Sequence, residues 1–405
     1  MSRINTGKLN IEITGSSHGK SVSAKLSGIE AGEKIDTDAL CAFMKRRSPG
    51  GEGSSPRKER DVPVIKSGIS EGITDGSPIE IVIANEDARP EDYESIRHIP
   101  RPGHADYPAY IRSGGSEDLR GGGVYSGRMT APLCAAGGIA LQILESRNIT
   151  IHAEHIKSGR DVPEGDSVGG IVSCTVTGLP IGLGGALFDG LEGRISQLVF
   201  AIPAVKGIEF GAGFGAAGML GSENNDEYAI EEGRVKMLSN NSGGILGGIS
   251  TGMPLIFNTA FKPTPSIALP QRSVNLQTME NVVLEIKGRH DRCVAPRAVP
   301  AVEAAAALAI LGSMENGGIS GLRSEIDSID ENIASLLSER FRLTDKIGAE
   351  KKKQGKSIKD AGRESEVLKH VSGSASEGCS GDIKEIYTEI ILRSCSRQEK
   401  NWNTD

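Results

Sequence analysis

The chain has 405 residues, which is too long for one simple core and indicates two or three domains. Its formal net charge of −7 and its pI near 5.7 argue against a general nucleic-acid surface. Two basic stretches, 45–61 and 287–297, are typical of loops that bind small anions, although a solvated charged surface would give the same pattern.

The cysteines and the apolar pattern bear on location. None of the six cysteines forms a CxxC pair, no apolar signal segment opens the chain, and no apolar run approaches the roughly 18 residues of a membrane helix. We therefore expect a cytoplasmic protein with reduced thiols and no membrane contact. His152 and His155 in "HAEH" lack a third ligand cluster, so we expect strand histidines and no metal site.

The part of the chain before residue 322 holds nearly all of the 53 glycines. Alternating apolar residues predict strands at 9–14, 77–85, 170–178 and 282–288. The loops 118–128 and 240–254 are too rich in glycine for helix interiors, and such loops often hold phosphate or a flat cofactor. The segment 302–311 (VEAAAALAIL) predicts a packed helix that closes this domain.

The pattern changes after a glycine-rich linker at 313–320, so we expect domains at 1–312 and 321–405. Apolar residues then recur at helical spacing over more than thirty residues: Leu322, Ile326, Ile329, Ile333, Leu336, Leu343 and Ile347. Two further helices follow, which predicts a small all-helical unit. Its first helix is too long to bury its apolar stripe alone, so we expect the unit to dimerise.

Two glycine motifs resemble nucleotide-binding signatures but fail in detail. "GSSHGKS" (15–21) has three residues between its glycines where a P-loop has four. "GFGAAG" (213–218) fits GxGxxG, but no amphipathic helix follows it. We therefore expect neither a nucleoside triphosphatase nor a Rossmann site.

Three separated segments carry histidine beside glycine or arginine: "GSSHG" (15–19), "RPGHADY" (101–107) and "GRHDRCVAPRAVPAVEA" (288–304). Any one alone could be structural. Together with "GGGVYSGRMTAP", "NNSGGILGGISTGMP" and "FKPTPSI", in this order, they closely resemble the chorismate synthase family over about three quarters of the chain. The resemblance implies an α+β fold with a β-α-β layered domain, and 1,4-anti elimination of phosphate from 5-enolpyruvylshikimate-3-phosphate with reduced FMN.

The same resemblance assigns roles to individual residues. His18 protonates the leaving phosphate, His104 serves the reduced flavin, and Asp291 assists proton removal. Residues expected near FMN or substrate are Arg47, Val124, Tyr125, Ser126, Arg128, Gly247, Lys262, Pro263, Thr264, Pro265, Ser266 and Arg289. The rival interpretation is a flavoprotein that binds FMN without eliminating phosphate.

Two positions depart from the family pattern. Ser16 stands where the family commonly has glutamate, and the stretch "GGEGSSP" (50–56) around Gly53 has no arginine, where bacterial relatives usually have one. These departures bear on phosphate affinity and on direct reduction of the flavin by NADPH. They favour an external flavin reductase as partner.

The tail, from "LRSEIDSIDENIASLLSERF" onward, resembles the helical type of chorismate mutase, which rearranges chorismate to prephenate. That pericyclic step requires only a folded dianion and charge stabilisation at the ether oxygen. Lys351 and Gln398 are the expected catalytic residues. The expected substrate-binding set is Arg323, Arg340, Lys351, Asp360, Arg363, Glu364, Ser394 and Gln398. We expect a homotetramer with paired tails; the alternative is a non-catalytic dimerisation tail.

Overall fold

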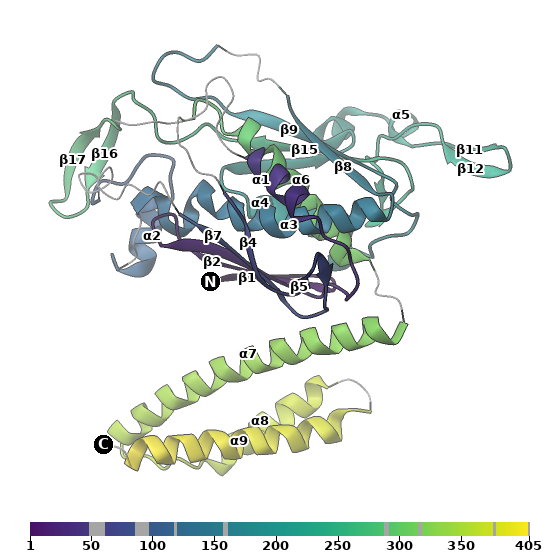
Figure 1. The fold of residues 1–405 in the computed structure, drawn as a ribbon. Coiled ribbons are helices and arrows are strands. Elements are labelled where there is room, and N and C mark those ends of the chain that lie inside the picture. Colours follow the sequence, from purple (N-terminus) through teal and green to yellow (C-terminus); the bar gives the residue numbers. More distant parts are fainter. Residues whose placement is uncertain are drawn as a thin grey trace. The chain divides into compact units, whose positions relative to one another are not determined.

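The computed structural model describes residues 1–47, 61–85, 97–116, 120–156, 161–286, 291–314, 318–375 and 378–403, without the side chains of 120, 318–325, 327, 328, 331 and 403. The chain divides into two compact units, Met1–Glu325 and Ile326–Asp405 (Figure 1). Helix α7 (Gly318–Lys353) begins inside the expected linker 313–320 and contributes to both units. The boundaries 1–312 and 321–405 therefore stay predictions.

The first unit contains a five-stranded antiparallel sheet in the order β1-β2-β3-β7-β4. Buried and exposed side chains alternate along its strands, so that one face of the sheet is apolar and packs into the core. In β7, Ile79, Ile81 and Ile83 are fully buried while Glu80 is exposed. The strands are β1 (Ser2–Thr6), β2 (Leu9–Gly15), β3 (Ser21–Ser27), β4 (Val64–Ser67) and β7 (Ile79–Ala84).

A second, four-stranded antiparallel sheet has the order β10-β15-β9-β8. It buries Phe257 of β15 opposite Cys174 of β9. Its strands are β8 (Thr150–Ile156), β9 (Gly170–Thr177), β10 (Val205–Phe210) and β15 (Leu255–Phe261). Strands were thus found at three of the four predicted segments, 9–14, 77–85 and 170–178, and the fourth, 282–288, only overlaps β17 (Glu280–Leu284) of a separate two-stranded sheet.

Helices α3 (Thr130–Ser146) and α6 (Ala295–Ser313) form the layer between the two sheets (Figure 1). Both are buried on nearly every side, as expected for helices that are apolar all round. They pack so closely that a Cβ on Gly137 would lie 2.2 Å from Cβ of Ala304. The predicted β-α-β layered domain is confirmed. Helices α4 (Leu191–Phe200) and α1 (Thr37–Lys45) cover α6 and α3 respectively.

The remaining elements of this unit are short. They are β5 (Ile69–Ser70), β6 (Ile73–Thr74), α2 (Asp106–Ser113), η2 (Arg120–Tyr125), η3 (Gly127–Met129), η4 (Leu187–Asp189), η5 (Gly213–Gly218), α5 (Gly221–Asn224), β11 (Tyr228–Glu231), β12 (Arg234–Met237), β13 (Ile245–Leu246), β14 (Ile249–Ser250), β16 (Gln271–Asn275) and β17 (Glu280–Leu284). The glycine motif at 213–218 forms η5 and is followed by only a four-residue helix, which agrees with the exclusion of a Rossmann site.

The second unit consists of α7 from Ile326 onward, α8 (Ala361–Ser374) and α9 (Ser380–Asn403), and is all-helical as predicted. Asp360 caps α8, because its side chain accepts a hydrogen bond from the Arg363 amide. The described apolar residues of the α7 stripe, from Ile326 to Ile347, are 47–65% exposed. A helix of 36 residues is about 54 Å long, and α8 and α9 leave this face uncovered.

Helix α6 is also long and apolar enough to cross a membrane by length and composition, with a mean hydropathy of 1.3. The sequence predicted a packed helix for its second half, 302–311, and no membrane helix, because Arg297 and Glu303 interrupt its apolar run. The helix is 83% buried inside the unit, and core helices commonly pass the same test.

All six cysteines are free thiols, and burial raises the pKa of Cys134 to about 12.

Candidate functional site

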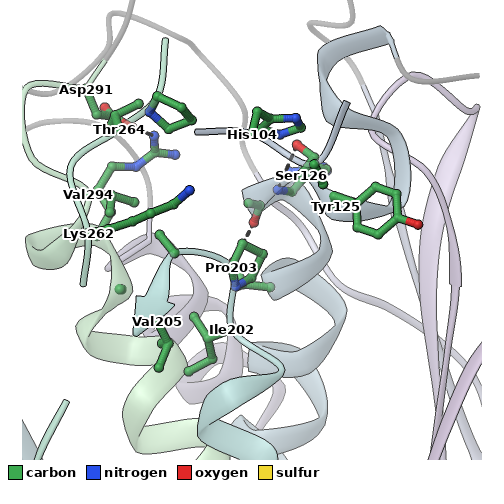
Figure 2. Close-up of a pocket in the computed structure, with 18 of the residues that line it drawn as sticks. His104, Tyr125, Ser126, Ile202, Pro203, Val205, Lys262, Thr264, Asp291 and Val294 are labelled. Carbon is green, nitrogen blue, oxygen red and sulfur yellow. Dashed lines mark hydrogen bonds and ion pairs between the residues drawn. The ribbon is translucent and has the colours of Figure 1, made fainter. Parts of the chain in front are cut away.

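A cavity of about 520 Å³ lies beside the first turns of α3 and α6, and its volume is typical of small-molecule sites (Figure 2). Four segments separated in sequence form most of its wall. They are residues 124–130 before and at the start of α3, 200–206 between α4 and β10, 262–266 after β15, and 291–298 at the start of α6.

A glycine turn packs against both predicted histidines. Gly121, Gly122 and Gly123 all have positive φ angles (58°, 92° and 54°), which side chains other than glycine rarely adopt. A Cβ on Gly121 would lie 2.0 Å from Cε1 of His18, and a Cβ on Gly122 would lie 3.1 Å from Nε2 of His104. The missing side chains therefore make room for both imidazole rings.

His104 is held by a buried group of charges. Its Nδ1 lies 2.6 Å from Oδ1 of Asp106, and Arg101 donates to the same carboxylate over 2.7 and 2.9 Å. Because a carboxylate only accepts, the Nδ1 position of His104 carries the hydrogen. Burial alone would raise the pKa of Asp106, but the hydrogen bonds from Arg101 and His104 hold it well below its usual range. Asp106 therefore stays ionised and fixes the ring.

A second buried carboxylate, Asp61, joins two cavity arginines. Arg47 and Arg128 each donate to one of its oxygens, and all three side chains are only 5–6% exposed. Arg47 also donates to the hydroxyl of Thr130 over 2.9 Å, and Arg128 to the carbonyl of Ala84 over 2.9 Å. Two arginines sharing one carboxylate leave a net positive charge in a dry wall, which favours an anionic ligand.

The opposite wall carries Asp291 and Lys262. Arg297 Nη1 lies 2.7 Å from Oδ2 of Asp291 and orients that carboxylate at the start of α6. Lys262 donates to the carbonyl of Gly103, which ties the segment after β15 to the His104 turn. Burial, together with nearby Lys206, lowers the pKa of Lys262. Figure 2 shows Lys262, Asp291 and His104 around the same space.

The charge of the lining is strongly one-sided. Among the described residues, six cationic side chains line the cavity against one carboxylate, that of Asp291. The cationic ones are Arg47, Arg101, Arg128, Lys206, Lys262 and Arg297. A concave cationic site on an acidic protein favours a small anionic substrate or cofactor.

The structure brings most of the expected synthase residues together. Those that line the cavity are Arg47, His104, Val124, Tyr125, Ser126, Arg128, Lys262, Thr264, Pro265, Ser266 and Asp291. His18 is not part of the lining but packs against Gly121, which is. Pro263 lies between the lining residues Lys262 and Thr264. Gly247 lies in the turn between β13 and β14 and does not line the cavity. Arg289 and Gly53 fall outside the described residues.

Several residues of the site were missed by the sequence reasoning. Asp61 and Asn85 escaped because their importance comes from burial between distant segments. The segment 200–206 carries no histidine, glycine motif or arginine that would have marked it. Ile202, Pro203 and Val205 give the cavity an apolar side (Figure 2).

Across the described part of the chain, no cluster of three His, Cys, Asp or Glu side chains is arranged for a metal.

The C-terminal unit gathers a second set of expected residues. Arg340 Nη1 donates to Oγ of Ser394 over 2.8 Å, and Gln398 Nε2 donates to the carbonyl of Thr344 over 2.9 Å. Ser394 and Gln398 are 4% and 6% exposed. Oε1 of Gln398 is buried and has no hydrogen-bond partner among the described residues, so a ligand donor there would satisfy it.

Three more expected residues lie at the α8 end of this unit. Lys351 Nζ donates to the carbonyl of Ile358 over 2.7 Å, and Glu364 lies 4.0 Å from the Cys395 sulfur. Arg363 is exposed and pairs with Glu366. The side chain of Arg323 is outside the described residues, although its backbone lies in α7.

Comparisons with known proteins divide the chain in the same way. Residues 9–162 and 155–314 match the family model for chorismate synthase, and residues 322–399 match the one for chorismate mutase type II. The second match supports a mutase over a non-catalytic tail.

Individual relatives agree with the first of these matches. A chorismate synthase of Lancefieldella parvula is 43% identical over 75% of this chain and 94% of its own length. One of Chitinophaga pinensis is 46% identical with the same coverage. A crystal structure of chorismate synthase superposes with a TM-score of 0.60 at 23% identity, covering 82% of this chain and 99% of that one, and shows the shared fold.

Proposed function

The chain belongs to the chorismate synthase family and carries a type II chorismate mutase domain, and on that premise we propose which residues carry out each reaction and that reduced FMN is the cofactor. The two domains make the protein a lyase and an isomerase of the shikimate pathway, which leads to aromatic amino acids. The observation that carries the proposal is the cationic cavity, which both His104 and Asp291 line.

The cavity fits a flavin phosphate and ring. Ile202, Pro203 and Val294 offer an apolar surface for a flat ring, and the cationic lining suits a phosphate group. Oγ1 of Thr264 is buried with no hydrogen-bond partner among the described residues, and a bound polar group would satisfy it. We assign Lys262, Thr264, Pro265 and Ser266, together with Val124 to Ser126, to holding FMN. Pro263, Gly247 and Arg289 remain in the expected set.

Elimination breaks a carbon–oxygen bond to phosphate and a carbon–hydrogen bond on the same substrate, without net redox change. When bound, reduced FMN would supply electron density to the substrate and a basic site for its proton. Arg47 and Arg128 stabilise the negative charge that develops on the phosphate. His18 Nδ1 faces Ser17 Oγ at 3.0 Å, so Nε2 is the atom that donates a proton to the leaving oxygen. Asp291, oriented by Arg297, assists removal of the proton.

In the C-terminal domain we propose that Arg340 binds a carboxylate of chorismate, while Lys351 and Gln398 stabilise charge on the breaking ether oxygen. Ser394 orients the Arg340 guanidinium. Asp360, Arg363 and Glu364 complete the site from α8, and Arg323 is expected from a partner chain. We propose paired tails in a homotetramer, and the exposed stripe of α7 supports the pairing.

The sequence departures bear on the source of electrons. Ser16 replaces the glutamate of the family pattern, and the stretch 50–56 lacks the arginine that this pattern led us to expect. We propose that an external flavin reductase supplies reduced FMN, with NADPH as the original electron donor. The free thiols support a cytoplasmic location, where such reductants are available.

The test is the dependence of phosphate release on the redox state of the flavin. With 5-enolpyruvylshikimate-3-phosphate under anaerobic conditions, we expect turnover with chemically reduced FMN and none with oxidised FMN or without flavin. Phosphate is measured directly. Full phosphate release with oxidised FMN would overturn the cofactor assignment, and tight FMN binding without phosphate release would favour the non-eliminating flavoprotein.

A further inference from the structure

Asn85, directly after β7, connects the turn that carries His18 to the buried arginine pair. Its Nδ2 donates to the carbonyls of Ser16 over 3.1 Å and Gly19 over 2.7 Å. Its Oδ1 accepts from Nε of Arg128 over 2.7 Å. One side chain therefore fixes both ends of the turn around His18 and one of the cavity cations.

The backbone adds to this arrangement. The amide of Asn85 donates to the carbonyl of Lys20 over 3.1 Å, and the amide of Gly19 donates to the carbonyl of Ser16 over 3.1 Å. The turn 16–20 is thus closed on itself and tied to the end of β7. A further tie to the site is the amide of Ser17, which donates to the carbonyl of Gly123 over 3.2 Å.

At the opposite end, Arg128 is already held by Asp61 and by the carbonyl of Ala84. Asp61 in turn holds Arg47. The distance from His18 to the two cations that receive the leaving phosphate is therefore set through Asn85. Only a primary amide can serve both ends, because it supplies two N–H donors and one carbonyl acceptor.

We propose that Asn85 is a positioning residue, which holds His18 in register with Arg47 and Arg128 for protonation of the departing phosphate. The proposal rests on the function assigned to His18. A proton donor displaced by about 1 Å loses on the order of 100-fold in rate, so this tether acts on the chemical step.

The test is a double-mutant cycle with Asn85→Asp and His18→Ala. Asp keeps the size of the side chain and the acceptor for Arg128 but loses both donors to the turn. We expect Asn85→Asp to lower kcat for phosphate release by about 10–50-fold in the wild-type background and by less than about 2-fold when His18 is already Ala. KM for the substrate and the FMN affinity should change by less than about 3-fold.

A matched control is Gln142→Glu. Gln142 likewise bridges two backbone groups, since it accepts from the Asp36 amide over 2.7 Å and donates to the Asp36 carbonyl over 3.1 Å, but it does not line the cavity. This variant removes one amide donor in the same way, and kcat should stay unchanged. Mutase turnover of added chorismate normalises the amount of folded chain.

The outcomes are distinguishable. Equal losses in both backgrounds, or no loss in the wild-type background, would overturn the positioning role. If His18→Ala alone leaves kcat unchanged, the role proposed for His18 fails instead. Should Asn85→Asp fail to fold, Asn85→Ala is measured in the same cycle, and misfolding of both variants would mark the residue as structural and overturn the proposal.

Discussion

Replacing His18 or Asp291 with alanine is expected to lower chorismate formation by about 100- to 1,000-fold and to leave mutase activity on supplied chorismate unchanged. Each side chain is assigned to one proton movement in the elimination. Neither belongs to the compact unit Ile326–Asp405, which contains Arg340, Lys351, Ser394 and Gln398. The two reactions should therefore respond independently.

The measurement is the rate of each half-reaction on the same purified variant. Asp291→Asn separates the contact with Arg297 from the role of Asp291 in proton removal, since it keeps an acceptor for Arg297 but loses the carboxylate. Asp189→Ala is the control, because it removes an arginine partner at an exposed site away from the cavity lining. Parallel loss of both activities in a soluble, folded variant would show that the domains depend on each other.

Mixing Arg323→Ala chains with Lys351→Ala chains should restore part of the mutase activity that each variant lacks alone. Arg323 lies seventeen residues before Arg340 on the same helix, which is about 25 Å at ~1.5 Å per residue. One small dianion cannot contact both from a single chain. The exposed α7 stripe supports an antiparallel partner, which would bring its own Arg323 to the first chain's Arg340 and Lys351.

Subunits are unfolded together, refolded and assayed with chorismate. Random pairing yields about half heterodimers, of which each has one intact site, so about a quarter of the wild-type activity is expected. Arg393→Ala mixed with Lys351→Ala is the control, since Arg393 forms only an exposed pair with Glu389 on α9. Re-associated Arg323→Ala and Lys351→Ala heterodimers without activity would mean that each site is built within one chain.

Much of the fold could be predicted because burial follows simple periodicities. Alternation in the segment around Ile81 marked a strand, and the i, i+3, i+4 spacing from Ile326 to Ile347 marked a helix of the correct order of length. The burial of α6 on almost every side explains why its apolar composition carried so clear a signal. Charged residues inside that helix nevertheless hid its length from a search for apolar runs.

The sequence predicted many of the side chains that line the cavity, but not how they are connected. The stretch around His104 stood out because it places histidine and aspartate beside arginine and glycine, whereas Asp291 was identified through the family resemblance. The glycine turn at 121–123 was expected to bring backbone amides to a ligand, whereas the structure shows that it also makes room for two histidine rings. Asp61 bonds to Arg128, 67 residues away in sequence, and Asn85 bonds to Ser16, 69 residues away. No local sequence pattern encodes such pairs.

The most direct test of the central claim is one anaerobic reaction with reduced FMN and 5-enolpyruvylshikimate-3-phosphate, in which phosphate, chorismate and prephenate are measured together. Two active domains on one chain predict that phosphate equals the sum of chorismate and prephenate at every time point, and that prephenate becomes the final product. Phosphate released without an equal amount of these two products, or chorismate that accumulates without forming prephenate, would contradict the assignment of two consecutive activities to this chain.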